Sequence, residues 1–175
     1  MLGLPVQSML PGKVVQVVDN RFPFGNMILI ETPLSLLSVD LVQSLPLPTP
    51  IPEKSIEMWS TCDKNIAPIT WSDDSKSIYI LYSHLQSKPD CQVGDTVACG
   101  QQIGAVGITG NSVAEHLHLE MRIGPSDARF GTIAMYTNQV YTQVPTSEER
   151  YNYCIWTISG RFQAFDPASF WKDKP

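Results

Sequence analysis

Residues 116–123 read HLHLEMRI, a stretch in which polar and apolar side chains alternate. Along a β-strand successive side chains point to opposite faces, so His116, His118, Glu120 and Arg122 are predicted to share one face while the apolar residues share the other. The alternation predicts a strand with one face against a core and one face open for chemistry. Two imidazoles on one face can divide the work between holding a metal and exchanging protons. An isolated H-x-H, however, is more typical of the solvated face of an edge strand.

The neighbouring sequence decides between these interpretations. The one remaining histidine, His84, lies in the sequence YSHL at the end of the apolar run 78–82. Between His84 and His116, glycines recur in the segments VGDTV (93–97), GQQIG (100–104) and VGITG (106–110). Glycines with this spacing are typical of tight turns and of close backbone approach between short strands.

Three motifs in this order resemble the lysostaphin-type (LytM-like) zinc endopeptidases, which cut peptide cross-links in bacterial peptidoglycan. Residues 82–85 match the family's Y-x-H-L, residues 94–110 match its G-D-x-V-x-x-G-Q-x-I-G-x-V-G-x-T-G, and residues 116–120 match its H-L-H-F-E with one apolar exchange. Weaker similarity extends upstream to the family's G-T-P-V, G-x-V and G-N-x-V-x-I segments and downstream to its closing D-P, at residues 3–6, 12–15, 25–30 and 165–167.

The resemblance implies a role for each histidine. His118 would be a zinc ligand, and the zinc would polarise the scissile carbonyl and activate a water. His84 and His116 would be the catalytic histidines that orient or deprotonate this water and stabilise the oxyanion. Glu120 could hydrogen-bond His118 and orient its ring, rather than act as a base.

The family's other two zinc ligands, a histidine and an aspartate in an H-x-x-x-D motif, have no match, because none of the three histidines precedes an aspartate at that spacing. A catalytic zinc normally takes three protein ligands, so two hypotheses follow. The chain is either an N-terminally truncated enzyme, favoured because loss of a leading strand exposes a sheet edge, or a domain that has shed its metal and only binds. Whether the chain is itself an enzyme is therefore left open.

The resemblance and the short apolar segments predict one all-β domain over residues 1–175, an antiparallel two-sheet sandwich or open barrel of the LytM (duplicated hybrid motif) type. Strands are predicted at 12–18, 27–31, 77–83, 102–107, 116–123 and 153–158. Two insertions, at about 32–76 and 124–161, interrupt the family pattern. The first combines leucines at near-helical spacing, predicted to form a packed cap, with an extended proline-rich stretch at 46–52. The second could wall a groove beside His116 or extend the sheet.

Four cysteines lack the C-x-x-C spacing of zinc ribbons. Cys91 and Cys99 flank the turn at 93–95 and could face each other across it, with Cys62 and Cys154 as a second pair. This is one of three possible pairings, and unpaired buried thiols are the alternative. The even count fits an oxidising compartment.

Composition narrows the possible partners. With 43% hydrophobic and 17% charged residues, the chain can form a core, and its net charge of −5 argues against nucleic acid. No apolar run is long enough to cross a bilayer, and residues 1–11 lack the basic start of a signal peptide. A biotinyl or lipoyl carrier, which also has G-D-x-V and G-Q segments, is excluded because no lysine lies between Lys88 and Lys172 to carry the cofactor.

The sequence therefore predicts a zinc-dependent endopeptidase that hydrolyses peptide cross-links of peptidoglycan outside the cytoplasmic membrane, in the extracellular space, periplasm or cell envelope. The alternative is a metal-free LytM-like module that binds cell wall, or an envelope protein partner such as another wall hydrolase.

Overall fold

The computed structural model describes residues 1–50, 62, 70–135 and 144–170, and its paired strands are all antiparallel. The strands are β1 (Pro5–Gln7), β2 (Gly12–Arg21), β3 (Gly25–Pro33), β4 (Thr70–Leu85), β5 (Thr96–Val97), β6 (Gln102–Ala105), β7 (His118–Arg129) and β8 (Gln163–Phe165). The helical elements are η1 (Leu34–Leu36), α1 (Val39–Gln43), α3 (Ser147–Thr157) and η2 (Pro167–Phe170). A six-stranded sheet runs in the order β5-β2-β3-β4-β7-β8, and β1 pairs with β6 separately. The predicted antiparallel, mostly β fold is confirmed.

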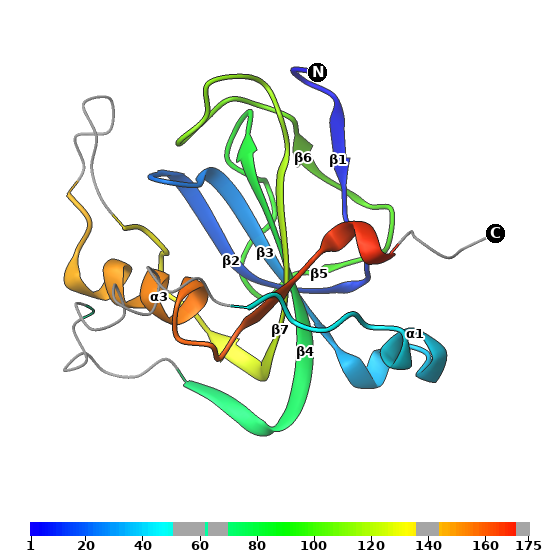
Figure 1. Ribbon diagram of the computed structural model, residues 1–175. Helices are drawn as coiled ribbons and strands as arrows, with labels where there is room; N and C mark the ends of the chain where they lie inside the picture. The colour runs from blue at the N-terminus through cyan, green and yellow to red at the C-terminus, as the bar shows by residue number, and fades with distance from the viewer. Residues whose placement is uncertain (51–61, 63–69, 136–143, 171–175) are drawn as a thin grey trace.

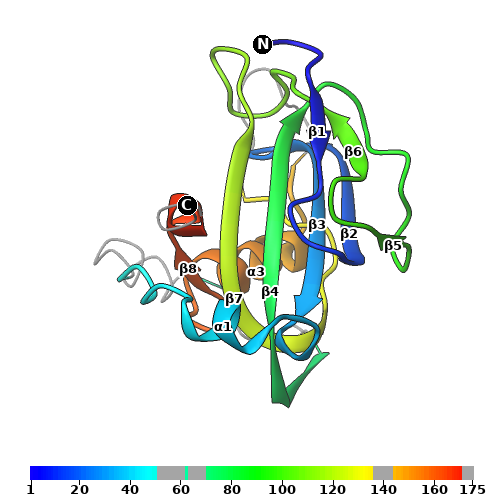
Figure 2. The same cartoon turned by 90° about the vertical axis from the view of Figure 1, so that its right-hand side faces the viewer.

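The large sheet is covered on both faces. In Figure 2, α3 lies behind the sheet and β1 lies in front of it, and Figure 1 shows the same separation from the side. The helix-side core contains residues of the sheet such as Leu29 and Tyr79 together with Ile155 and Trp156 of α3. The β1-side core contains Val6, Ile28, Ile80, Ile103 and Val106, among others. Strand β3 is therefore buried along its whole length except at Pro33.

Strand β7 shows the alternation that the sequence predicts. Met121 is buried in the β1-side core, and Leu119 and Ile123 pack against it, whereas Arg122 is turned toward Trp156 on the opposite face. The predicted start of the strand is wrong by two residues, because His116 makes only an isolated bridge with Gly107 before the strand begins. Strand β7 also continues to Arg129, and β4 begins at Thr70, so both strands extend into the segments regarded as insertions.

The strand predicted at 153–158 is wrong, because these residues lie at the end of helix α3. The helix begins with a capping box, in which the Thr146 hydroxyl accepts from the Glu149 backbone N–H and the Glu149 carboxylate accepts from the Thr146 N–H. Tyr151, Cys154 and Ile155 then fall on one buried face at helical spacing. The aromatic and β-branched composition suggested a strand, whereas the cap and the spacing select a helix.

Cys62 and Cys154 form a disulfide that links the first insertion to α3, with their Cα atoms 6.3 Å apart. The second predicted pair does not form. The Cys99 thiol donates to the Met9 carbonyl at 3.3 Å, and Cys91 packs against the β1-side core, so both remain free thiols.

The leucine-rich part of the first insertion forms η1 and α1, and its apolar residues Leu34, Leu37 and Leu45 pack against the β1-side core as the predicted cap. Of the proline-rich stretch, residues 46–50 form no helix or strand, and the Thr49 N–H donates to the Ala164 carbonyl of β8. Residues 51 and 52 lie outside the described residues. Within the part of the chain that is described, no helix is both long and apolar enough to cross a membrane.

Candidate active site

The three histidines, one from the motif at 82–85 and two from the motif at 116–120, meet at one end of the large sheet. The ring centroids of His84 and His116 are 4.8 Å apart, and those of His84 and His118 are 5.5 Å apart. His118 pairs across the sheet with Ser83, so the start of β7 lies beside the end of β4, where His84 is found. Phe24, in the turn between β2 and β3, contacts His118 with its ring edge at 5.9 Å between centroids.

His84 is placed by a break in the regular strand. The pairing of β3 with β4 shifts register between Asn26 and Ile28, and His84 adopts a left-handed backbone conformation with φ of 60°. Its N–H donates to the Phe24 carbonyl at 3.0 Å, which holds the strained residue in place. A β-bulge re-aims a side chain, and a non-glycine residue at positive φ costs of order 1–3 kcal/mol, so the surrounding structure must hold His84 in this conformation.

The loop that carries His116 is packed closely against its neighbours through glycine. A Cβ on Gly110, which has φ of +75°, would lie 2.4 Å from the Gly25 nitrogen and 2.5 Å from the Pro23 carbonyl oxygen. A Cβ on Gly107 would lie 2.4 Å from the Gln86 nitrogen. The predicted close backbone approach is thus confirmed at these two glycines, and it fixes the loop on which His116 stands.

Each histidine uses one ring nitrogen to bond the protein. His84 Nδ1 lies 2.7 Å from the Thr109 carbonyl, and His116 Nδ1 lies 2.9 Å from the Ala114 carbonyl. Because a carbonyl oxygen only accepts, these bonds place the proton on Nδ1 and leave the lone pair on Nε2 in both neutral rings. His118 is the reverse case, since its Nε2 lies 2.9 Å from the Glu120 carboxylate and Nδ1 keeps the lone pair.

The surroundings of His84 favour its neutral form. Burial lowers the pKa of His84 below its usual value, the bond to the Thr109 carbonyl opposes this, and the nearby His118 and His116 add to the lowering. A neutral imidazole with its Nε2 lone pair exposed to a cleft can accept a proton from water or a hydroxyl group.

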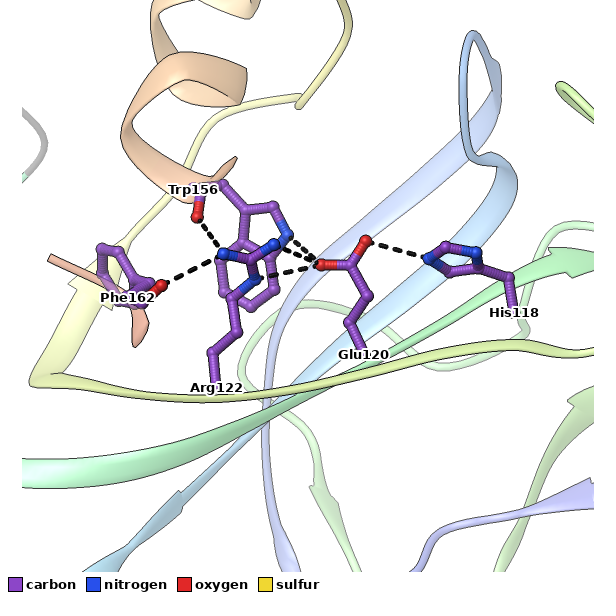
Figure 3. Close-up of polar contacts among 5 residues, drawn as sticks. All are labelled: His118, Glu120, Arg122, Trp156 and Phe162. Atoms are coloured by element: carbon purple, nitrogen blue, oxygen red, sulfur yellow. Dashed lines mark hydrogen bonds and ion pairs between the residues drawn. The ribbon is translucent and has the colours of Figure 1, made fainter. Parts of the chain in front are cut away.

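Glu120 connects His118 to the interior (Figure 3). Its Oε2 accepts from Arg122 Nε at 3.0 Å, from Arg122 Nη2 at 2.8 Å and from Trp156 Nε1 at 3.0 Å, while its Oε1 bonds His118. Burial alone would raise the pKa of Glu120, but the hydrogen bond from His118 and the Arg122 charge outweigh it and lower the pKa to about 2. Glu120 is therefore an ionised acceptor behind His118, in agreement with the supporting role that the resemblance suggests.

His84 and His118 open onto a cleft of about 230 Å³, and its lining residues are Pro23, Phe24, His84, Asn111, His118, Glu120, Tyr153 and Thr157. His116 contacts His84 at the edge of this cleft and is not one of the lining residues. Two of these residues, Tyr153 and Thr157, come from α3, so the second insertion does wall a groove, beside His118 rather than His116. Sequence patterns gave no signal for either residue, because their approach to β7 depends on how α3 docks. A larger cleft of about 480 Å³ at the opposite end of β3 contains none of the histidines.

The donor groups around His118 do not fit a complete zinc site. Among the described residues there is no group of three histidine, cysteine, aspartate or glutamate side chains placed to hold one metal ion. A catalytic zinc needs three protein ligands, and the nearest carboxylate, Glu120, is already engaged by four N–H groups.

One protein-family model matches part of the chain. Residues 59–129 match the model of Peptidase family M23, a segment that includes His84, His116 and His118 but is less than half of the chain. Within residues 59–129 the chain is similar to this peptidase family. The resemblance predicted from the histidine and glycine motifs is therefore confirmed over the M23 segment, which runs from the first insertion to the end of β7.

Solved structures of M23 and related peptidases also match, at low identity. A catalytic-domain mutant of the prophage-encoded M23 protein EnpA from Enterococcus faecalis is 21% identical, with a TM-score of 0.42, and the match covers 73% of this chain and 65% of that one. The catalytic domain of the antimicrobial peptidase lysostaphin from Staphylococcus simulans is 23% identical, with a TM-score of 0.42, and the match covers 83% of this chain and 69% of that domain. A zinc-containing peptidase from Vibrio cholerae is 23% identical, with a TM-score of 0.41, and the match covers 69% of this chain and 24% of that protein.

The chain thus spans about two thirds of the length of EnpA and lysostaphin as crystallised, and about a quarter of the Vibrio protein. We base the functional proposal on the family match and on the geometry of the histidines.

Proposed function

We propose that the protein is a cell-wall endopeptidase that hydrolyses peptide bonds in the cross-links of bacterial peptidoglycan, with the histidine cleft as its active centre. The observation that supports this most directly is the meeting of His84, His116 and His118 within a segment that matches a peptidase family. Three histidines that gather at one end of the sheet provide groups that accept and donate protons near neutral pH.

The bonding of His84 and His116 suits them for proton transfer. Both rings are fixed through Nδ1–H, so each presents Nε2 as an acceptor that can take a proton from an attacking water and return it to the leaving amine. Their ring centroids are 4.8 Å apart, which would allow one ring to accept a proton from the water while the other, when protonated at Nε2, donates to the carbonyl oxygen as it becomes negative.

Zinc at His118 stays a proposal. His118 Nδ1 has the lone pair that a metal ligand needs, but two further ligands would have to come from outside the described residues. We therefore derive no step of hydrolysis through a metal ion. Zinc content after dialysis, measured on the protein and on His118→Ala, tests this part by itself.

The proposed setting is the cell envelope or the extracellular space. The Cys62–Cys154 disulfide supports an oxidising compartment, since such bonds are rare in the cytosol. Peptidoglycan peptides are the proposed substrate on the strength of the resemblance, and an envelope protein partner is a further possibility under the second candidate below.

A panel of synthetic cross-link peptides tests the proposed activity. Half of the panel carries glycine bridges and half carries D-amino-acid stem peptides, and chromatography with mass spectrometry detects cleavage. We expect cleavage of one class, reduced about 100-fold or more by His116→Ala, because loss of a general acid or base typically costs that much. The matched control is Glu115→Gln, which changes an exposed neighbour of His116 and should retain the rate. Absence of cleavage across the panel contradicts the enzyme proposal.

A second candidate function is a metal-free module that binds peptidoglycan or regulates another wall hydrolase. The observation that favours it is the incomplete donor set around His118 among the residues described. It predicts that the protein binds purified peptidoglycan without cutting it, and that His116→Ala binds as well as the unsubstituted protein does.

A further inference from the structure

Helix α3, in the second insertion, is connected to His118 at the start of β7 by a series of side-chain contacts. Arg122 is buried on β7, and its Nη1 donates to the carbonyls of Trp156 and Phe162 at 2.9 and 3.1 Å. Its guanidinium carbon lies 4.8 Å from the centre of the Trp156 ring, which is fully buried. The guanidinium therefore has three contacts that help to hold it in place besides those with Glu120.

The two oxygens of Glu120 have unequal partners (Figure 3). Three N–H groups, two from Arg122 and one from Trp156, point at Oε2, whereas His118 Nε2 alone points at Oε1. Arginine and tryptophan side chains can only donate, so Oε2 must accept. The remaining oxygen then also accepts, because an ionised carboxylate has no proton to give.

We propose that Arg122 and Trp156 are positioning residues that clamp Oε2 of Glu120, so that Oε1 holds His118 in the Nε2–H tautomer and leaves the Nδ1 lone pair for a ligand in the cleft. The clamp acts through Glu120, and neither residue needs to touch substrate. Because Trp156 belongs to α3, the Nε2–H tautomer of His118 on β7 depends on the packing of α3 against the sheet. Only the role of Nδ1 as a ligand-binding atom rests on the proposed function. The tautomer of His118 does not, because it is a property of the protein without substrate or metal.

Glu120→Gln tests the clamp, because an amide has one accepting oxygen and one donating nitrogen. If Arg122 and Trp156 hold their positions, the three N–H groups select the amide oxygen, and the amide NH2 must face His118 Nε2. His118 can then only accept at Nε2, so its proton moves to Nδ1. The expected result is a tautomer reversal at His118, whereas His84 and His116 keep their protons on Nδ1.

Long-range ¹⁵N–¹H NMR of the metal-free protein at a pH where the histidines are neutral measures the tautomer of each ring. The unsubstituted protein should show Nε2–H at His118, and Glu120→Gln should show predominantly Nδ1–H. Glu149→Gln is the matched control, because Glu149 of α3 forms a similar pair with Arg21 of β2, away from His118, and its loss should leave the tautomer unchanged. If the network only stabilises the fold, Glu120→Gln should lower the free energy of unfolding and leave the proton of His118 on Nε2.

The proposal is overturned if His118 stays Nε2–H in Glu120→Gln, since the amide oxygen would then face the histidine and the clamp would not hold it. It is also overturned if the unsubstituted protein shows Nδ1–H at His118. If Glu120→Gln fails to fold, hydrogen exchange in the unsubstituted protein decides. Arg122 Nε–H and Trp156 Nε1–H should exchange at least about 10-fold more slowly than exposed groups, and free exchange of both rejects the clamp. Failure of peptide cleavage with the predicted tautomers intact would reject only the proposed function.

Discussion

Loss of the Cys62–Cys154 disulfide is expected to destabilise the protein strongly. The bond joins residues 92 positions apart, and the loop-closure entropy for a loop of this length corresponds to about 4.6 kcal/mol at 25 °C. This is a large part of the 5–15 kcal/mol that a domain typically has, on the order of the whole stability of a marginal one. Because Cys154 lies on α3 with Tyr153 and Trp156, the helix that walls the cleft should be the element most affected.

Urea unfolding with and without reductant measures this effect. We expect reduction to lower the free energy of unfolding by roughly 3–5 kcal/mol, and Cys154→Ala to give a similar value that reductant no longer changes. Cys91→Ala is the control, since Cys91 is a free thiol and its loss should leave the reductant effect intact. A shift below about 1 kcal/mol on reduction, or four reactive thiols in the unreduced unfolded protein instead of the expected two, would refute the pairing and the reasoning from it.

Three further predictions concern the site and its supports. The folded-state pKa of Glu120 is depressed from about 4.5 to about 2, so its contribution to the stability of the metal-free protein is complete above pH 4.5 and is lost as the pH falls toward 2. Acid titration of unfolding should show a loss of about 3 kcal/mol in the unsubstituted protein that Glu120→Gln lacks, and equal slopes in both proteins would contradict the assignment. Gly110→Ala should destabilise by about 1–3 kcal/mol more than Gly100→Ala in thermal unfolding, because both glycines have positive φ but only the Cβ at 110 meets backbone atoms. Tyr153→Ala should raise KM for the cleaved peptide about 10-fold while Tyr153→Phe does not, because the ring walls the cleft, and an unchanged KM would remove Tyr153 from the binding surface.

The sequence is sufficient to predict the fold class and to single out the three histidines that the structure brings together, and the physical reasons are local. Alternation along residues 118–123 follows from strand geometry, and the glycines at 107 and 110 leave no room for a side chain where backbones meet. His84 and His118 become neighbours because β4 and β7 pair, and this pairing is seen only in the structure.

The contribution of α3 could not be predicted in the same way. The sequence does contain a signal for the start of the helix, since Thr146 and Glu149 have capping-box spacing. The strand predicted at 153–158 does not take this signal into account. The contact between Trp156 and Glu120 has no local signature, because it joins residues 36 positions apart through the docking of the helix. The strained φ of His84 arises from a register shift that only the paired strands reveal. Pairing of cysteines likewise depends on tertiary distance, which left three combinations open.

The central claim, that the histidine cleft cuts wall peptides, is tested most directly by counting new amino termini in purified peptidoglycan during incubation with the protein, while the protein in the pellet is measured in parallel. We predict a steady rise in free amines that is lost in His116→Ala although both proteins sediment with the wall. Sedimentation of the unsubstituted protein with no new amines would contradict the claim and leave the binding module as the function of the fold.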